Sequence, residues 1–125
     1  MRETDIMGRW ELVSFARWRD GREVDHPLGP KPSGLIHYTT DHGMSSFLYK
    51  DPSQAWDVPM LAAYGGTWKL VGNDVHHDVQ FNTDTERMGT VLVRHARFDG
   101  PLLVLETPVK NGVSIRITWR RPKPA

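Results

Sequence analysis

The segment TWKLVGNDVHHDVQF, residues 67–81, decides the fold. Apolar and polar side chains alternate in each half of it, and this period of two is typical of strands with one buried face. Residues 72–74, Gly-Asn-Asp, interrupt the alternation with a turn signal. The segment therefore predicts an antiparallel hairpin whose inward face carries Trp68 on one strand, and His77 and Phe81 on the other.

The same alternation recurs on both sides of this hairpin, with Asp-Gly and Asn-Gly pairs as turn signals between the runs. We expect eight strands, at residues 8–18, 34–40, 43–50, 65–71, 74–82, 88–98, 101–107 and 112–121. Short strands joined mainly by hairpins predict one all-β domain over residues 1–125, closed as an eight-stranded antiparallel up-and-down barrel. A two-sheet sandwich has the same strand count and is the alternative.

Two segments interrupt this meander. Residues 24–33 contain three prolines, which cannot donate to a strand ladder, so the sequence predicts a loop there. Residues 51–64 begin with Asp-Pro-Ser, a typical helix start, but Pro59 limits any helix to about one or two turns. We interpret this second segment as a short loop or helix that forms a lid over one barrel mouth; an ordinary surface connection fits as well.

Strand periodicity also sorts side chains by face. The sixth strand fits two registers, and we prefer the one with Arg94 and Phe98 inside, because it leaves His95 and Arg97 outside. Tyr38 fits either face of its strand. The first strand has an apolar face that we expect to point inward: Trp10, Leu12, Ser14, Ala16 and Trp18. The small residues beside large aromatic ones favour a cavity inside the barrel.

Composition narrows the function classes. The formal charge is +1, without the basic excess of a nucleic-acid-binding protein. The chain has no cysteine, which excludes disulfides and thiolate chemistry and favours a reducing compartment. No signal-peptide pattern and no apolar run of membrane-spanning length is present. We expect a cytoplasmic protein without nucleic-acid or membrane partners, and we leave a homodimer open.

Several short motifs occur in an order that resembles one family. The chain opens with G-R-W-E-L-V-S-F at residues 8–15, followed by G-L-I-H-Y at residues 34–38 and D-H-G-M-S at residues 41–45. Further matches are Y-G-G-T-W at residues 64–68, V-H-H-D-V at residues 75–79, Arg94 with Asp99-Gly100, and I-T-W-R-R at residues 117–121. This order resembles the small bacterial and fungal lipocalin-like domain proteins over nearly the whole chain.

The resemblance implies a calyx with an interior pocket. Proteins of the broader lipocalin-like group include carriers and cofactor-free enzymes that cyclise, isomerise or cleave small molecules, so the resemblance alone does not choose between these functions. In lipocalin folds a basic residue of the last strand often lies over the tryptophan of the first. Arg120 or Arg121 over Trp10 is the matching pair, which we interpret as a structural cation–π contact.

His77, Arg94 and Tyr38 are the candidate catalytic residues. A neutral imidazole inside a cavity can act as a general base, since burial readily moves its pKa. Arg94 could hold a carboxylate or a developing enolate, and Tyr38 could add a donor. The structural alternative is a core histidine, with Arg94 in an ion pair with Glu106 or Asp78.

The sequence thus predicts a barrel that binds a small apolar or aromatic metabolite and transforms it without a cofactor, as an isomerase, cyclase or lyase. The alternatives are a non-catalytic binding protein for such a ligand, and a barrel filled by its own side chains that acts through its surface. No metal site is expected, because His76 and His77 point to opposite faces. The residues expected to contact the ligand are Trp18, Trp56, Tyr64, Trp68 and Phe98.

Overall fold

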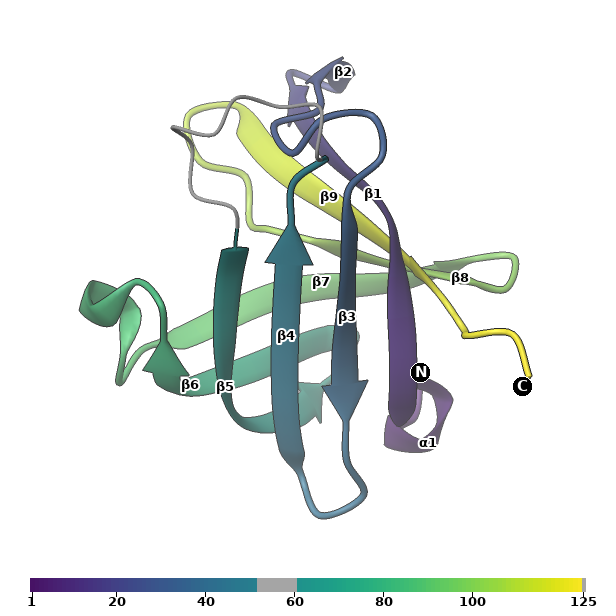
Figure 1. The fold of residues 1–125 in the computed structure, drawn as a ribbon, viewed down its shortest axis with the longest axis vertical. Helices are drawn as coiled ribbons and strands as arrows, with labels where there is room; N and C mark the ends of the chain where they lie inside the picture. Colours follow the sequence, from purple (N-terminus) through teal and green to yellow (C-terminus); the bar gives the residue numbers. More distant parts are fainter. Residues whose placement is uncertain (52–60, 125) are drawn as a thin grey trace.

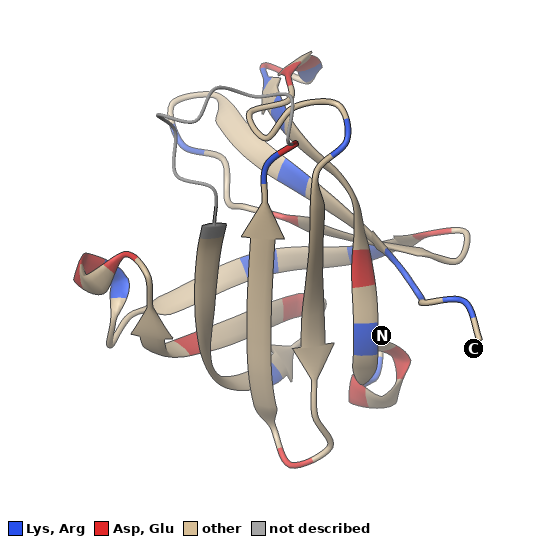
Figure 2. Cartoon of the chain, in the orientation of Figure 1, with Lys and Arg blue, Asp and Glu red and all other residues tan. Residues whose placement is uncertain are grey.

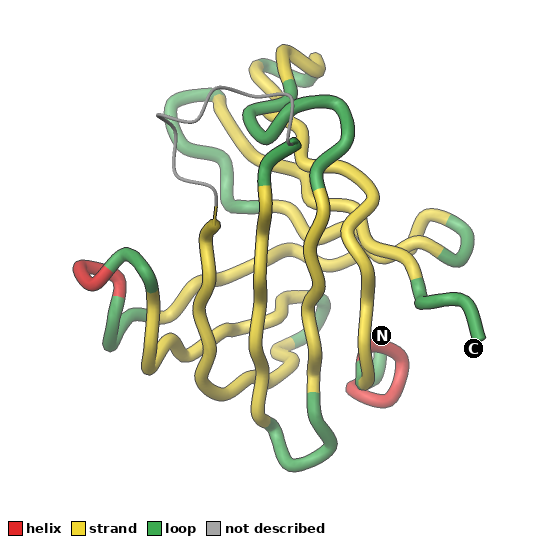
Figure 3. Tube along the Cα trace, in the orientation of Figure 1, coloured by secondary structure: helices red, strands yellow, loops and turns green. Residues whose placement is uncertain are grey.

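The computed structural model of the protein describes residues 1–51 and 61–124. Nine strands make up one antiparallel sheet (Figures 1 and 3). The elements are α1 (Glu3–Ile6), β1 (Gly8–Arg19), β2 (Arg22–Asp25), β3 (Ser33–Tyr38), β4 (Gly43–Tyr49), β5 (Leu61–Val71), β6 (Asp74–Asn82), the 3₁₀ turn η1 (Thr85–Arg87), β7 (Val91–Asp99), β8 (Leu102–Glu106) and β9 (Val113–Arg120).

The sheet closes into a barrel because β1 pairs with two strands on opposite sides. Its first third, from Gly8 to Glu11, pairs with β3, and most of its length pairs with β9. From β3 to β9 each strand pairs with the next along the chain, which is an up-and-down order. The eight-stranded barrel predicted from the sequence is therefore confirmed, and the sandwich alternative is wrong.

Some local elements were not predicted. The short strand β2 pairs with the end of β1, so Val24 and Asp25 lie in a strand rather than in the expected loop. One helical turn, α1, precedes the barrel, and the 3₁₀ turn η1 lies between β6 and β7. The lid predicted for residues 51–64 falls largely outside the described residues, and Tyr64 belongs to β5.

Two β-bulges reverse the inward face of a strand partway along it. In β1 the pairing with β9 skips Val13, so Phe15 pairs with Ile117 and both side chains point into the barrel. In β6 the pairing with β5 skips Gln80, which leaves Phe81 outside and 69% exposed. Because an extra residue shifts every following side chain to the other face, the inward placements of Ser14, Ala16, Trp18 and Phe81 were wrong.

The bulge of β6 lies against Gly66, where a Cβ atom would come within 1.9 Å of the Asp78 carbonyl oxygen. Glycine is therefore required at this position by close backbone approach. The register between β5 and β6 shifts between Gly65 and Gly66, at this point of close approach.

One end of the barrel is packed solid. Ile6 of α1 is fully buried there, and its carbonyl oxygen accepts a hydrogen bond of 2.9 Å from the indole nitrogen of Trp10. The guanidinium of Arg121 lies 3.8 Å from the centre of the Trp10 ring, so one of the two predicted cation–π pairs is present. Acidic and basic residues are interspersed along the strands and loops (Figure 2).

Candidate ligand-binding site

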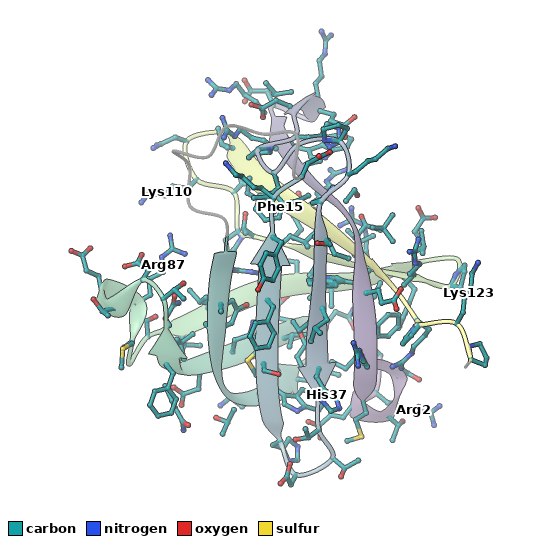
Figure 4. All side chains as sticks on the ribbon, viewed as in Figure 1. Arg2, Phe15, His37, Arg87, Lys110 and Lys123 are labelled. Atoms are coloured by element: carbon teal, nitrogen blue, oxygen red, sulfur yellow. The ribbon has the colours of Figure 1, made fainter. Side chains whose placement is uncertain are left out.

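The other half of the barrel encloses a cavity of about 440 Å³. Figure 4 shows two of its lining residues, Phe15 and Arg87, in the upper half of the view, and His37 in the lower half. The apolar part of the wall consists of Phe15, Ile36, Leu48, Ala62, Leu92, Leu105, Ile115, Ile117 and Trp119. The polar part consists of Ser46, Tyr64, His77, Asn82, Thr83, Asp84, Arg87, Arg94 and Thr107.

His77 lies between two tyrosine hydroxyls in the cavity wall. The Tyr38 oxygen is 2.6 Å from its Nε2 atom, and the Tyr64 oxygen is 2.8 Å from its Nδ1 atom. Tyr38 and His77 are 0% and 1% exposed. Of these three residues, His77 and Tyr64 line the cavity and Tyr38 does not. The three side chains come from β3, β5 and β6.

Burial keeps all three groups neutral. Burial, and next the positive charge of Arg94, lower the pKa of His77 to about 3. Burial raises the pKa of the Tyr38 hydroxyl well above its ordinary value, and it also raises the pKa of Tyr64. At neutral pH the site therefore contains an uncharged imidazole and two protonated phenols.

These protonation states fix the direction of the hydrogen bonds. A neutral imidazole donates from one nitrogen and accepts at the other. Among the described residues, the Tyr38 hydroxyl has no hydrogen-bond partner except His77, so its proton goes to Nε2. The Nδ1–H of His77 then donates to the Tyr64 oxygen, which leaves the Tyr64 hydrogen for another acceptor, such as a ligand.

Two cations line the cavity in the part of the chain that is described. Arg87 is exposed and pairs with Asp84 at 3.3 Å, whereas Arg94 forms no ion pair with a described residue. Its Nη1 atom donates to the Val93 carbonyl oxygen at 3.0 Å. Neither Glu106 nor Asp78 pairs with it: Glu106 lies outside the barrel, where Arg97 and Arg116 contact it at 3.0 and 3.2 Å. The structural ion pair considered for Arg94 is therefore wrong, and the preferred register of this strand is correct.

The structure brings together His77, Arg94 and Tyr64 at the cavity, with Tyr38 directly behind His77. The other predicted contact residues lie elsewhere. Trp68 is buried below the cavity, with its ring centre 5.0 Å from that of Tyr38. Phe98 is 42% exposed and lies beside Trp10 at the packed end of the barrel.

Trp18 lies on the outer surface, under the guanidinium of Arg116 at 3.6 Å. The bulge at Val13 is the reason, since Trp18 now pairs with the outward Ser114. Trp56 lies outside the described residues. The prediction that Trp18, Trp68 and Phe98 contact an internal ligand is thus not supported by their positions.

Sequence reasoning missed several wall residues. Phe15 was placed outside, since the bulge that turns it inward leaves no pattern in the sequence. Asn82 reaches the cavity for the same reason, after the bulge in β6. No pattern in the sequence points to Ser46, because the residues of its strand, Gly43–Tyr49, fit either inward face. The last strand, by contrast, alternates regularly, and the pattern predicts the inward face that the structure shows for Ile115, Ile117 and Trp119.

In the described part of the chain, no three His, Cys, Asp or Glu residues come close enough together to hold a metal ion. Nor does that part contain a helix that is long and apolar enough to cross a membrane.

The comparisons with known proteins agree with this architecture. The lipocalin-like domain family matches residues 7–121, so the chain belongs to this family. Among solved structures, a redesigned beta barrel is similar at a TM-score of 0.50 and 10% identity, covering 96% of this chain and 94% of that one. A mutant of the fluorescent protein UnaG is similar at a TM-score of 0.50 and 10% identity, covering 98% and 100%. A comparison with curated proteins finds no match.

Proposed function

We propose that the protein binds a small, largely apolar molecule inside the barrel. The observation that carries this proposal is the cavity of about 440 Å³ with its mainly aliphatic and aromatic wall. Ligand pockets are typically about 300–1,000 Å³ and combine such walls with a few polar groups that orient the ligand. Membership of the lipocalin-like domain family supports the same function.

The polar groups gather on one side of this apolar wall. Tyr64 and Arg94 would orient an oxygen of the ligand, since both carry hydrogen-bond donors and both line the cavity. His77 and Tyr38 lie behind Tyr64 and fix the position of its hydroxyl through hydrogen bonds of 2.8 and 2.6 Å. His77 and Tyr38 are therefore positioning residues in this proposal.

Cofactor-free catalysis is the second candidate, and the Tyr–His–Tyr arrangement beside Arg94 favours it. A guanidinium and a phenol hydroxyl that face one point in a dry cavity stabilise an enolate as it forms. Such stabilisation would serve an isomerase, cyclase or lyase. His77 is a poor general base here, because both of its nitrogens already bind tyrosines and its pKa is about 3.

Binding is tested with the neutral fluorescent probe 1-aminoanthracene and two matched variants. Ile115→Phe adds bulk inside the cavity, whereas Val91→Phe adds the same kind of bulk on the outer surface, where Val91 is 53% exposed. We expect saturable 1:1 binding to the wild type and to Val91→Phe, and binding at least about tenfold weaker for Ile115→Phe. Absence of saturable binding to the wild type, or equal affinity for both variants, would overturn the proposal.

Catalysis is tested separately by mass spectrometry with a panel of small aromatic and terpenoid acids, ketones and lactones. We expect the wild type to convert a bound compound, and Tyr64→Phe to bind it with little conversion. If the wild type binds compounds of this panel but returns them unchanged, it binds them without catalysis and the catalytic proposal is wrong for this panel.

A further inference from the structure

Within residues 1–51 and 61–124, two buried side-chain atoms have no hydrogen-bond partner: the Nε atom of Arg94 and the Nε1 atom of Trp119. Both atoms are hydrogen-bond donors. Both residues line the same cavity, although they come from β7 and β9. A buried donor without a partner is costly, so native proteins seldom leave one unused.

The charge of Arg94 is also unbalanced. In the described part of the chain no carboxylate lies within 4.0 Å of it, and only its Nη1 atom donates, to a carbonyl oxygen. Its neighbours on the outer surface differ, since Arg97 and Arg116 both contact Glu106. A guanidinium does not lose its proton at any physiological pH, so its remaining donors need an acceptor from another source.

The neighbouring titratable groups, Tyr64 and His77, cannot supply that acceptor as an anion. Tyr64 keeps its proton because burial raises its pKa, and its hydrogen is itself available for donation. His77 accepts at Nε2 from Tyr38 and donates from Nδ1, so both nitrogens are used. The inner wall therefore presents a surplus of donors and one uncompensated positive charge.

We propose that the ligand of this cavity carries a single carboxylate on a compact apolar body, with the carboxylate facing Arg94 and Trp119. This inference rests on the proposed function, since it names the chemical class of the molecule bound. One unpaired guanidinium matches one negative charge, and its planar fork pairs with the two oxygens of a carboxylate. The apolar body packs against Phe15, Ile115 and Ile117.

The test compares two ligands of nearly equal shape, 2-naphthoic acid and 2-naphthamide, by their ability to displace 1-aminoanthracene at pH 7. The wild type should bind the acid at least about tenfold more tightly than the amide, as expected for a charge-assisted hydrogen-bonded pair. Arg94→Met should lose this preference and bind the acid and the amide with similar affinity. Arg97→Met removes a cation from the outer face of the same strand and should keep the preference.

The outcomes separate this inference from the proposed function. If the wild type binds 1-aminoanthracene but binds the acid and the amide equally, the carboxylate assignment is overturned and the binding cavity stands. If the probe itself does not bind, both fail. The wild-type comparison holds even if Arg94→Met does not fold, and Arg94→Lys then serves as the second variant, with a reduced preference for the acid.

Discussion

Replacing Tyr38 with phenylalanine tests the hydrogen-bond arrangement on which the site depends. The substitution removes one oxygen and leaves the ring, which is 0% exposed and packs against Trp68. The only described partner of the lost hydroxyl is the Nε2 atom of His77, at 2.6 Å. After the change, one nitrogen of a buried imidazole has no partner in either tautomer.

The size of the effect follows from that unpaired nitrogen. Leaving a buried polar atom without its hydrogen bond costs about 1–3 kcal/mol. Phenylalanine keeps the same apolar ring, so a change in packing does not contribute to the free-energy difference. We therefore expect Tyr38→Phe to lower the free energy of unfolding by about 1–3 kcal/mol. Tyr49→Phe removes a hydroxyl from a residue that is 42% exposed, and should change the free energy of unfolding by less than about 0.5 kcal/mol.

Urea unfolding of the wild type and both variants at pH 7 gives these free energies by linear extrapolation. Nitrogen NMR of the His77 ring gives the second readout, since the arrangement requires the proton on Nδ1 in the wild type. An unfolding free energy of Tyr38→Phe equal to that of Tyr49→Phe would refute the reasoning. A proton found on Nε2 would refute the direction in which Tyr38 donates.

Three further predictions concern stability. Folding lowers the pKa of His77 from 6.5 to about 3, so as the pH falls the unfolded chain takes up this proton before the folded chain does. The free energy of unfolding should therefore fall as pH drops from about 6.5 towards 3, by up to about 1.4 kcal/mol per pH unit. His77→Gln should flatten this dependence in urea titrations, and an unchanged slope would contradict the assignment. Gly66→Ala should lower the free energy of unfolding, measured by thermal unfolding, by about 3 kcal/mol, because its Cβ would lie 1.9 Å from a backbone oxygen. Gly65→Ala, whose Cβ would lie 3.1 Å from a backbone oxygen, should lower it by about 1 kcal/mol. Equal losses in the two variants would contradict this reasoning. Arg121→Met should lower the free energy of unfolding by about 0.5–1 kcal/mol, because it loses the contact with an indole ring at 3.8 Å. Arg120→Met, on the exposed side, should not change the free energy of unfolding measurably. A larger loss in Arg120→Met than in Arg121→Met would show that Arg121 does not make the stabilising contact.

The barrel itself could be predicted because alternation and turn residues are local signals. His77 was placed inside correctly, since apolar and polar residues alternate around it. Arg94 was placed inside by a preference between two registers, and the structure agrees with the preferred one. Trp18 and Phe81 were placed inside wrongly, because each follows a bulge, and one unpaired residue changes the face without changing the composition of the strand. The contact of Tyr64 with His77 depends on the register between β5 and β6, which no single strand pattern specifies.

The two bulges also explain why the barrel is packed at one end and hollow at the other. Below them, period two points Trp10 and Trp68 inward, and these large rings fill the interior. Beyond them the face is reversed, so Phe15 and Asn82 reach the interior in place of Trp18 and Phe81. Phenylalanine thus takes the place of tryptophan at the bulge in β1, and asparagine takes the place of phenylalanine at the bulge in β6, so the side chains that enter the cavity are smaller. The hydrogen bonds of His77 join the two halves, and a ligand that contacts Tyr64 therefore acts on a group tied directly to the packed core.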